Sequence, residues 1–321
     1  MSPTPSSHQR LGQTIAGLVG VPEHPALRHL VDALKARYGG CVAAVLFYGS
    51  CLRSEDPYDG LVDLYLVVDD YRCVNGGWLK AVWNRALPPN VFYTEIDHEN
   101  RTLRCKYAVL SLADLKRGTS ARWYHSYFWG RFSQPTAVAF ARDAATGAAL
   151  ELSLGRAAVT FLNRVLPRLP AEGSVQSLWE GGLRLSYRAE LRAEGASRAR
   201  LITRSNPAYY ETVTRAAAPL LRYSLEIEPS TEDTRYRAAI PAPRRAAGRA
   251  GWLVRIGQGK LLSVARLLKA LFTFAGGLDY IAWKLERHSG VPVEIPEKVR
   301  RYPLIFVWGM FWKLYRRGVF R

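Results

Sequence analysis

Two apolar runs dominate the first third of the chain, at residues 42–48 and 61–68. Both are rich in Val, Leu, Phe and Tyr and are bounded by turn-forming residues, which predicts two buried strands. Apolar residues at helical spacing over residues 25–38, followed by two glycines, predict a helix before them. Residues 91–96 and 103–112 predict two more strands, separated by a polar turn. Together these elements predict a small α/β sheet.

The pattern becomes helical after residue 113. Before that point, two glycines and two prolines bound a short crossover helix predicted over residues 78–85. Beyond it, apolar residues at three- and four-residue spacing predict helices near residues 123–132, 150–166, 175–192 and 207–223. The predicted divisions are a flexible N-terminus (1–24), an α/β domain (25–113), an all-helical domain (114–230), a linker (231–255) and a basic amphipathic tail (256–321).

Charge is spread unevenly along the 321 residues. The chain has 45 Lys and Arg against 27 Asp and Glu, a net charge of +18. From Arg235 to the end there are eighteen Lys and Arg and four acids, so most of the excess lies there. The four cysteines have no spacing typical of zinc ligands, which predicts free thiols and a reducing compartment.

The basic tail also carries an apolar face. Leu261, Val264, Leu268, Leu271 and Phe272 lie at helical spacing, with Lys260, Arg266 and Lys269 among them. Residues 304–312 form a second apolar run between basic residues, and it is too short to span a bilayer. Such segments are typical of helices that lie on an anionic membrane surface. The alternative is a core helix of the helical domain.

The turn between the first two strands carries the candidate chemistry. Gly49 and Ser50 follow the first strand directly, and Asp63 lies near the start of the second. A glycine at a strand end lets backbone N–H groups approach a phosphate, because it has no Cβ. A carboxylate on the next strand can hold the divalent cation of a nucleoside triphosphate. This arrangement predicts a nucleotide site, against the alternative of a simple strand–turn–strand with one exposed acid.

Further acids and one lysine are candidates for the same site. Two positions after Asp63, on the same face of the strand, the chain has Tyr65 rather than a second carboxylate. Asp69 at the end of that strand and Glu95 late in the third are the candidate additional metal ligands, with solvated acids as the alternative. Lys106 in the fourth strand is a candidate catalytic partner of phosphate, or else a charged residue that protects a sheet edge.

Six collinear segments carry a family resemblance: Tyr-Gly-Ser at 48–50, Val-Asp-Leu at 62–64, Val-Val-Asp-Asp at 67–70, and the segments 106–111, 129–135 and 185–194. They resemble the polymerase-beta-type nucleotidyltransferase superfamily and, within it, the mitochondrial-type phosphatidate cytidylyltransferases, the translocator assembly and maintenance family. Residues 263–284 are similar to that family's membrane-associating helix. The family also has a single Asp in its Val-Asp-Phe-like strand.

The chain departs from the family in several places. The Trp-His and His-Tyr-Ser motifs after the second strand are absent, and a shorter segment, 72–89, replaces them. Residues 92–94 are Phe-Tyr-Thr where the family tends to have Tyr-Phe-Asn, and Glu190 stands where Asp is expected. The tail from residue 291 lies outside the resemblance.

The resemblance implies synthesis of CDP-diacylglycerol from CTP and phosphatidic acid, a step of phospholipid biosynthesis that releases pyrophosphate. It implies roles for residues that match the family's segments: Gly49, Ser50 and Arg131 for the nucleotide, Asp63 with Mg²⁺, Lys106 in catalysis, and Tyr187 and Arg192 for the lipid phosphate.

The expected partners are CTP, phosphatidic acid and an anionic membrane surface. The expected location is peripheral, on the cytoplasmic face of a bacterial inner membrane or on the matrix face of the mitochondrial inner membrane. Nucleic acid is disfavoured, because the excess of Lys and Arg lies outside the predicted catalytic domains. Two alternatives remain: a nucleotidyltransferase with an RNA or small-molecule acceptor, and a catalytically degenerate scaffold at a membrane surface.

Overall fold

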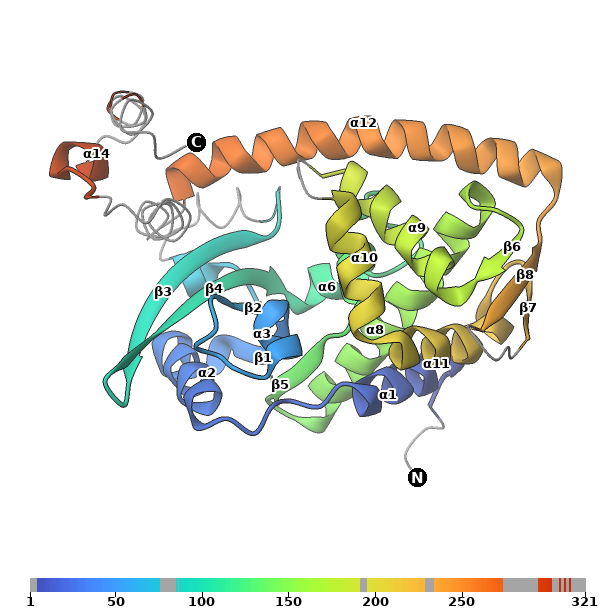
Figure 1. Ribbon diagram of the computed structural model, residues 1–321. Coiled ribbons are helices and arrows are strands. Elements are labelled where there is room, and N and C mark those ends of the chain that lie inside the picture. The colour runs from blue at the N-terminus through green and yellow to red at the C-terminus, as the bar shows by residue number, and fades with distance from the viewer. Residues whose placement is uncertain are drawn as a thin grey trace.

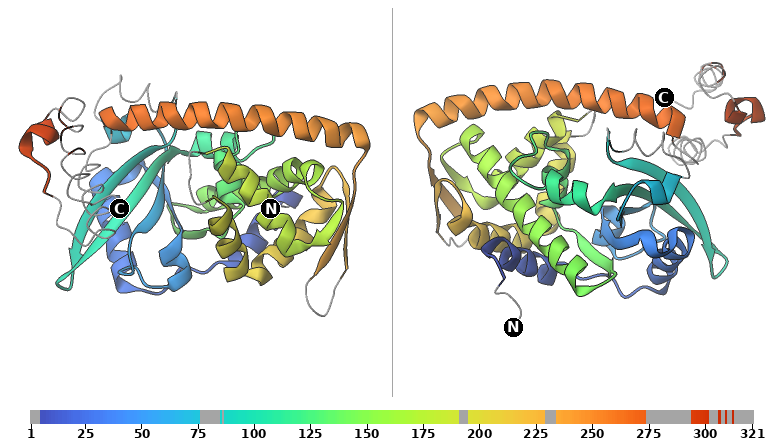
Figure 2. Two further views of the ribbon diagram at one scale, coloured as in Figure 1. Left: turned by 45° about the horizontal axis from the view of Figure 1, so that its top comes forward. Right: turned by 180° about the vertical axis from the view of Figure 1, so that it is seen from behind.

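The computed structural model describes residues 5–75, 85, 87–190, 195–228, 234–273, 294–301, 306, 309 and 312. A five-stranded sheet lies beside a larger helical region (Figure 1). The long helix α12 (Ala242–Thr273) runs along one side of the molecule and contacts both parts (Figure 2). The predicted fold class, an α/β sheet followed by a helical region, is confirmed.

The sheet has the strand order β3–β4–β2–β1–β5. Its strands are β1 (Val42–Tyr48), β2 (Val62–Val68), β3 (Asn90–His98), β4 (Arg101–Ser111) and β5 (Ala137–Ala141). Neighbours β2 and β4 are parallel and the other pairs are antiparallel. All residues of β1, and all of β2 except Asp63, are buried, as their uninterrupted apolar runs indicate. The first four strands were predicted; β5 lies inside the segment predicted to be all-helical.

Two helices precede the sheet. Helix α2 (Pro25–Tyr38) has the predicted bounds and ends at Gly39, whose φ of 59° favours glycine. Helix α1 (Ser7–Leu18) was not predicted. It buries Leu11 and Ile15, so the expectation of a flexible N-terminus over residues 1–24 is wrong for this segment.

Helix α1 packs closely on α8 (Ala144–Val165). The approach depends on glycines, since a Cβ on Gly12 would overlap the carbonyl of Glu151 and one on Gly155 would overlap that of His8. Small residues at such a crossing let two helix backbones touch. The N-terminal segment is therefore part of the helical region.

Among the described residues, the helical region contains six further α-helices and a small sheet. The helices are α6 (Leu112–Gly118), α7 (Tyr127–Phe132), α9 (Val175–Arg188), α10 (Gly195–Ser205), α11 (Pro207–Ala217) and α12. The sheet has the order β6 (Glu172–Ser174), β8 (Arg235–Ala239), β7 (Ser224–Glu228). The linker predicted over residues 231–255 is wrong, because β8 and the first half of α12 occupy most of it.

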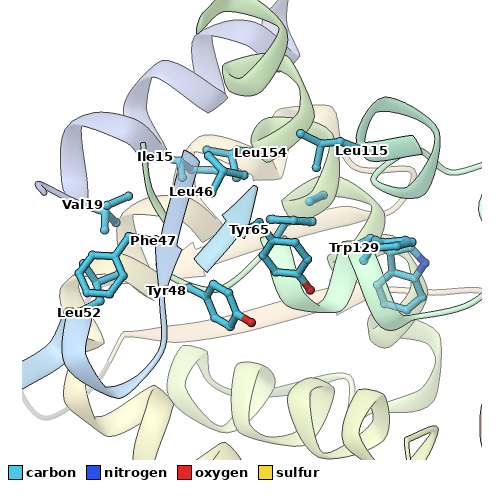
Figure 3. Close-up of a cluster of buried hydrophobic side chains, with 14 of the residues drawn as sticks. Ile15, Val19, Leu46, Phe47, Tyr48, Leu52, Tyr65, Leu115, Trp129 and Leu154 are labelled. Atoms are coloured by element: carbon cyan, nitrogen blue, oxygen red, sulfur yellow. The ribbon is translucent and has the colours of Figure 1, made fainter. Parts of the chain in front are cut away.

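One continuous cluster of buried side chains joins the sheet to the helices. Figure 3 shows Ile15 of α1, Leu46 of β1, Tyr65 of β2, Trp129 of α7 and Leu154 of α8 in this cluster. The predicted boundary near residue 114 therefore does not divide the core, since β5 returns to the sheet and α1 packs on α8.

The cysteines differ from the prediction of four free thiols. Cys41, at the end of the short helix η1 (Gly39–Cys41), forms a disulfide with Cys73 of α4 (Arg72–Asn75). Cys51 and Cys105 are buried thiols. The helix predicted near residues 78–85 and most of the apolar run at 304–312 lie outside the described residues.

Candidate functional site

The site is built around the turn from β1 into the short helix α3 (Ser50–Ser54). Gly49 in this turn has a φ of 98°, a conformation that side chains with a Cβ rarely adopt. A Cβ at this position would also lie 2.7 Å from Oδ2 of Asp63. Two independent constraints thus require glycine here, and together they bring the backbone of the turn against the carboxylate of Asp63.

Asp63 belongs to a row of polar side chains that crosses the sheet. The strand register pairs Tyr48 with Asp63, Asp63 with Lys106, and Lys106 with Tyr93. Directly paired residues point to the same face of a sheet, so these four share one face. The structure therefore brings together Gly49, Asp63 and Lys106, three of the predicted site residues.

The Asp63 carboxylate is paired with Lys106 and still has unused capacity. Nζ of Lys106 lies 3.2 Å from Oδ1 of Asp63, and the two side chains are 30% and 16% exposed. The ion pair lacks hydrogen-bond geometry, so the buried Oδ1 has no hydrogen-bond partner among the described residues. A buried oxygen of this kind is a candidate ligand for a cation.

Tyr65 explains why the site has a single strand carboxylate. Its ring is fully buried and packs 5.0 Å from that of Tyr48 and 4.8 Å from that of Phe132, measured between centroids. Tyr48 and Tyr65 lie side by side in Figure 3. Burial raises the pKa of the Tyr65 phenol, so it stays neutral. The position of a second metal carboxylate is thus filled by a packing residue.

Three arginines line a small cleft next to Gly49. The guanidinium of Arg131, from α7, lies 5.2 Å from the centre of the Tyr48 ring. Arg53, from α3, donates to the carbonyl of Gly49 at 2.9 Å. Arg198, from α10, lines the same cleft, and no acid is among its described lining residues.

Two of the three arginines, Arg53 and Arg198, repel each other in a way that favours an anion. Burial of the third, Arg131, is offset in part by Glu190, which balances some of its charge and raises its pKa. Burial lowers the pKa of Arg53, and the charge of Arg198 lowers it further. Like charges that are partly removed from water repel each other until an anion lies between them. Nε of Arg131 is buried and has no hydrogen-bond partner among the residues described, so it has a donor available to a ligand.

The opposite wall of the cleft is held by a short hydrogen-bond chain. The Tyr187 hydroxyl donates to Oε1 of Gln134 at 2.9 Å, and Nε2 of Gln134 donates to the carbonyl of Gly130 at 2.7 Å. Tyr187 was predicted to contact the lipid phosphate, and it does line the cleft. Arg192, its predicted companion, lies outside the described residues. Ser50 is half-buried at the start of α3.

Two predicted metal ligands are not brought to Asp63. Asp69 lies six residues further along the strand direction, about 20 Å away at the usual rise. Its carboxylate is exposed and pairs with Arg142 at 2.6 Å. The expectation that Asp69 shares an ion with Asp63 is therefore corrected.

Glu95 lies on the same face of the sheet but in the next row. It pairs with Arg104, whose Nε is 3.3 Å away, and accepts a hydrogen bond of 2.5 Å from the Tyr93 hydroxyl. Its carboxylate is thus engaged two strands away from Asp63, which corrects the expectation of a shared ion. In the part of the chain that the structure describes, no three His, Cys, Asp or Glu residues gather as a metal site.

The donor set nevertheless fits Mg²⁺ in one way. This ion commonly takes one or two carboxylates and completes its shell with water and substrate phosphates. Oδ1 of Asp63 is a hard oxygen without a hydrogen-bond partner among the described residues, and Gly49, which has no Cβ, lets the backbone of the turn approach Oδ2. Such an ion would depend on the substrate for most of its ligands.

Arg53 and Arg198 were missed at the level of sequence. Arg53 could have been found, because a helix that begins after Gly49 returns its side chain over the glycine carbonyl four residues later. Arg198 is far away in the chain, and nothing in the pattern of the sequence pairs α10 with this turn.

Comparisons with known proteins add little. No family model matches the chain, and no curated protein matches it. Among solved structures, a nucleotidyltransferase-like protein from Exiguobacterium sibiricum is similar with a TM-score of 0.25 and 11% identity, over 90% of this chain and 91% of that one. A likeness at this TM-score supports no conclusion about function.

Proposed function

We propose that the protein is a nucleotidyltransferase that transfers CMP from CTP to phosphatidic acid. The observation that carries the proposal is a buried carboxylate oxygen, without a hydrogen-bond partner among the described residues, close to a cleft lined by three arginines. A triphosphate with a divalent cation carries a positive charge that complements the carboxylate and negative charges that complement the arginines. Asp63 suits the cation, and Arg53, Arg131 and Arg198 suit the phosphate oxygens.

The reaction needs positioning and charge neutralisation more than a protein nucleophile. A phosphate oxygen of phosphatidic acid attacks the α-phosphorus of CTP and forms the new P–O bond. The bond from the α-phosphorus to the bridging oxygen breaks, and pyrophosphate leaves with that electron pair. The attacking oxygen is already ionised at neutral pH, so no general base is required. Lys106 and Arg131 would neutralise charge on the reacting phosphates.

Mg²⁺ would supply charge neutralisation of the triphosphate when bound beside Asp63. The contribution of the chain is to hold one ligand oxygen in place and to bring the glycine turn close to it. The enclosed part of the cleft is about 30 Å³, room for about one water molecule. The arginine side chains therefore have to move apart when phosphates enter.

Membrane association is part of the proposal, and the exposed face of α12 supports it. Four outward side chains fall within about 100° around the helix. They are Leu253, Val254, Leu261 and Val264, at 73%, 62%, 71% and 43% exposure. Among the described helices none is long and apolar enough to cross a bilayer. An exposed apolar stripe on such a helix suits the boundary between headgroups and acyl chains.

The basic residues of α12 are arranged differently from the expectation. Arg266 was predicted to lie among the lipid-facing residues. Instead it donates to the carbonyl of Pro88 at 3.2 Å and lies 4.3 Å from the centre of the Tyr127 ring. Arg255 is also turned inward and is 2% exposed. Lys260 is exposed and lies next to the apolar stripe.

The direct test is a turnover assay with the full chain. CTP, Mg²⁺ and vesicles that contain phosphatidic acid should give a lipid-soluble nucleotide and pyrophosphate, and vesicles without phosphatidic acid should not. Release of pyrophosphate with RNA or a small alcohol in place of the lipid would keep the transferase and change its acceptor. Binding to vesicles with no turnover under any divalent metal would favour the scaffold. The Asp63–Lys106 ion pair makes this alternative specific, because Lys106 could take the place of the metal ion beside Asp63.

A further inference from the structure

A second, larger cleft lies between α6, the C-terminal half of α8 and the first half of α12. Its volume is about 1030 Å³, and it shares no lining residue with the candidate active site. The view from behind shows α8 running below α12 on this side of the molecule (Figure 2). Eight cationic side chains line it: Lys116, Arg117, Arg122, Arg156, Arg164, Arg222, Arg244 and Arg255. No Asp or Glu is among the described residues that line it.

The floor of this basic cleft holds a deeply buried guanidinium. Arg255 is 2% exposed, and its Nε donates to the carbonyl of Tyr124 at 2.7 Å. Aromatic rings surround it, with centres 4.3 Å (Tyr124), 4.8 Å (Trp252) and 5.7 Å (Trp129) away. These contacts orient the cation but do not neutralise it, because a carbonyl and a ring face carry no net charge.

Arg164 lies close to Arg255, and Arg222 lies close to Arg164, and neither has an acidic partner in the described structure. Arg164 is half-buried and donates to the carbonyl of Ala121 at 2.9 Å. Burial and the neighbouring Arg222 lower the pKa of Arg164, and burial together with Arg164 lowers that of Arg255 to about 10. Among the described lining cations, Arg117 is the one with a carboxylate partner, Asp114 at 2.7 Å.

Such an arrangement is unfavourable unless an anion completes it. Buried charges in proteins are normally paired, since removing them from water is expensive. Here the like charges converge on one concave space instead of pointing apart into solvent. We propose that the basic cleft binds a compact ligand that carries several phosphate groups, either a soluble polyphosphorylated molecule or a multiply phosphorylated lipid headgroup. This proposal does not depend on the proposed function.

The shape of the cleft favours a compact ligand over a nucleic-acid strand. Nonspecific nucleic-acid binding uses exposed Lys and Arg along a surface that follows the backbone. In this cleft, Arg164 and Arg255 lie on the floor of a concavity whose volume is typical of small-molecule sites. Each guanidinium group presents several N–H donors in a planar fork, and several such groups around one cleft suit clustered phosphate oxygens.

Inorganic tripolyphosphate is a suitable probe, with binding measured by calorimetry on the full chain in EDTA. The test variant is Arg164→Gln/Arg222→Gln, which removes two lining charges and leaves the buried Arg255 in place. The matched control is Arg215→Gln/Arg237→Gln, which removes two charges from exposed ion pairs elsewhere. We expect the test variant to bind at least about tenfold more weakly and the control within about twofold of the parent. Equal weakening in both, or no binding by the parent, would overturn the proposal.

Two further arms identify the source of the phosphates. Vesicles of phosphatidylcholine with and without phosphatidylinositol bisphosphate test a lipid headgroup. If their binding falls in the Arg164→Gln/Arg222→Gln variant as tripolyphosphate binding does, the ligand is a headgroup; if it is unchanged, the ligand is soluble. In competition experiments, single-stranded RNA that binds more tightly per phosphate group than tripolyphosphate would overturn the proposal of a compact ligand. Circular dichroism and the melting temperature show whether either variant remains folded.

Discussion

The two clefts differ in how their positive charge is balanced. In the candidate active site, the carboxylate of Asp63 lies against Gly49, which also lines the small cleft of three arginines. Eight cationic side chains and no described acid line the basic cleft, against three arginines in the cleft beside Gly49. An acid at the edge of an arginine cleft suits a ligand that arrives with a metal ion, such as a nucleoside triphosphate. Arginines without an acid suit an anion that binds alone. If both proposals hold, the charge pattern separates two kinds of phosphate site within one chain.

The largest effect that separates the clefts should come from Asp63→Asn. Loss of the charge removes the one strand carboxylate available to a cation, which is worth several kcal/mol of transition-state stabilisation. We expect turnover to fall by about a thousandfold or more, with tripolyphosphate binding in the basic cleft unchanged. Asp69→Asn is the matched control, because that acid pairs with Arg142 at the other end of β2, and its activity should stay within about twofold. Retained turnover in Asp63→Asn would contradict the assignment.

The second-largest effect on turnover is expected for a substitution at Gly49, in the turn between β1 and α3. Gly49→Ala introduces a Cβ at a φ of 98° and only 2.7 Å from Asp63 Oδ2. Displacement of the carboxylate by about an ångström should reduce turnover by about a hundredfold. Gly17→Ala, in α1 with open space around it, should leave turnover unchanged and stabilise slightly. Steady-state kinetics and melting temperatures measure both, and equal activity of the two variants would remove Gly49 from the site.

His125, which is buried close to Arg255 and Arg266, provides a pH test of this region. Burial, and then Arg266 and Arg255, lower the pKa of His125 from 6.5 to about 3. Below pH 6.5 the unfolded chain takes up a proton that the folded chain does not, so stability falls as the pH falls. Between pH 6.5 and about 5 this group should remove up to about 2 kcal/mol.

The variant His125→Asn keeps an acceptor for the backbone N–H of Tyr127, which Nδ1 of His125 binds at 3.1 Å, and it does not titrate. Urea unfolding at several pH values should show a shallower loss of stability on acidification in this variant. An identical pH dependence in both proteins would show that His125 is not held neutral.

The smallest expected effect concerns the outer face of α12. Leu253→Ser/Leu261→Ser removes two exposed apolar side chains that touch neither cleft. We expect flotation with anionic vesicles to weaken by about tenfold, since each side chain contributes on the order of 1 kcal/mol or more when buried. Soluble CTP binding should not change. Leu18→Ser, an exposed leucine on α1, is the control, and equal loss in that variant would contradict a specific membrane face.

The sequence predicted the sheet well and the long-range packing poorly. Strands β1 to β4 and helix α2 carry strong local patterns, since continuous apolar runs and a terminal glycine leave few alternatives. Strand β5 has only five residues, four of them half-buried, and its place beside β1 depends on contacts far along the chain. Helix α1 was missed for a similar reason, because the glycines that seat it on α8 look like flexible residues until both helices are in place.

The site residues likewise divide into those that local sequence patterns predict and those that depend on long-range packing. Gly49, Asp63 and Lys106 follow from adjacent strands, so the register joins them. Asp69 and Glu95 were expected nearby because sequence alone does not say which end or row of the sheet an acid occupies. Tyr65 was recognised as the missing carboxylate, but its role in packing against Phe132 required the fold. The basic cleft could not be predicted, since its arginines come from α6, α8, α12 and two connecting segments and meet only in three dimensions.

The most direct measurement follows CTP that is radiolabelled at its α-phosphate, incubated with the full chain, Mg²⁺ and phosphatidic acid vesicles. The account predicts label in the lipid phase for the parent protein, loss of that label in Asp63→Asn, and retention of it in Asp69→Asn. Label that stays entirely in the aqueous phase with the parent protein, across Mg²⁺ and Mn²⁺, would contradict the proposed transfer.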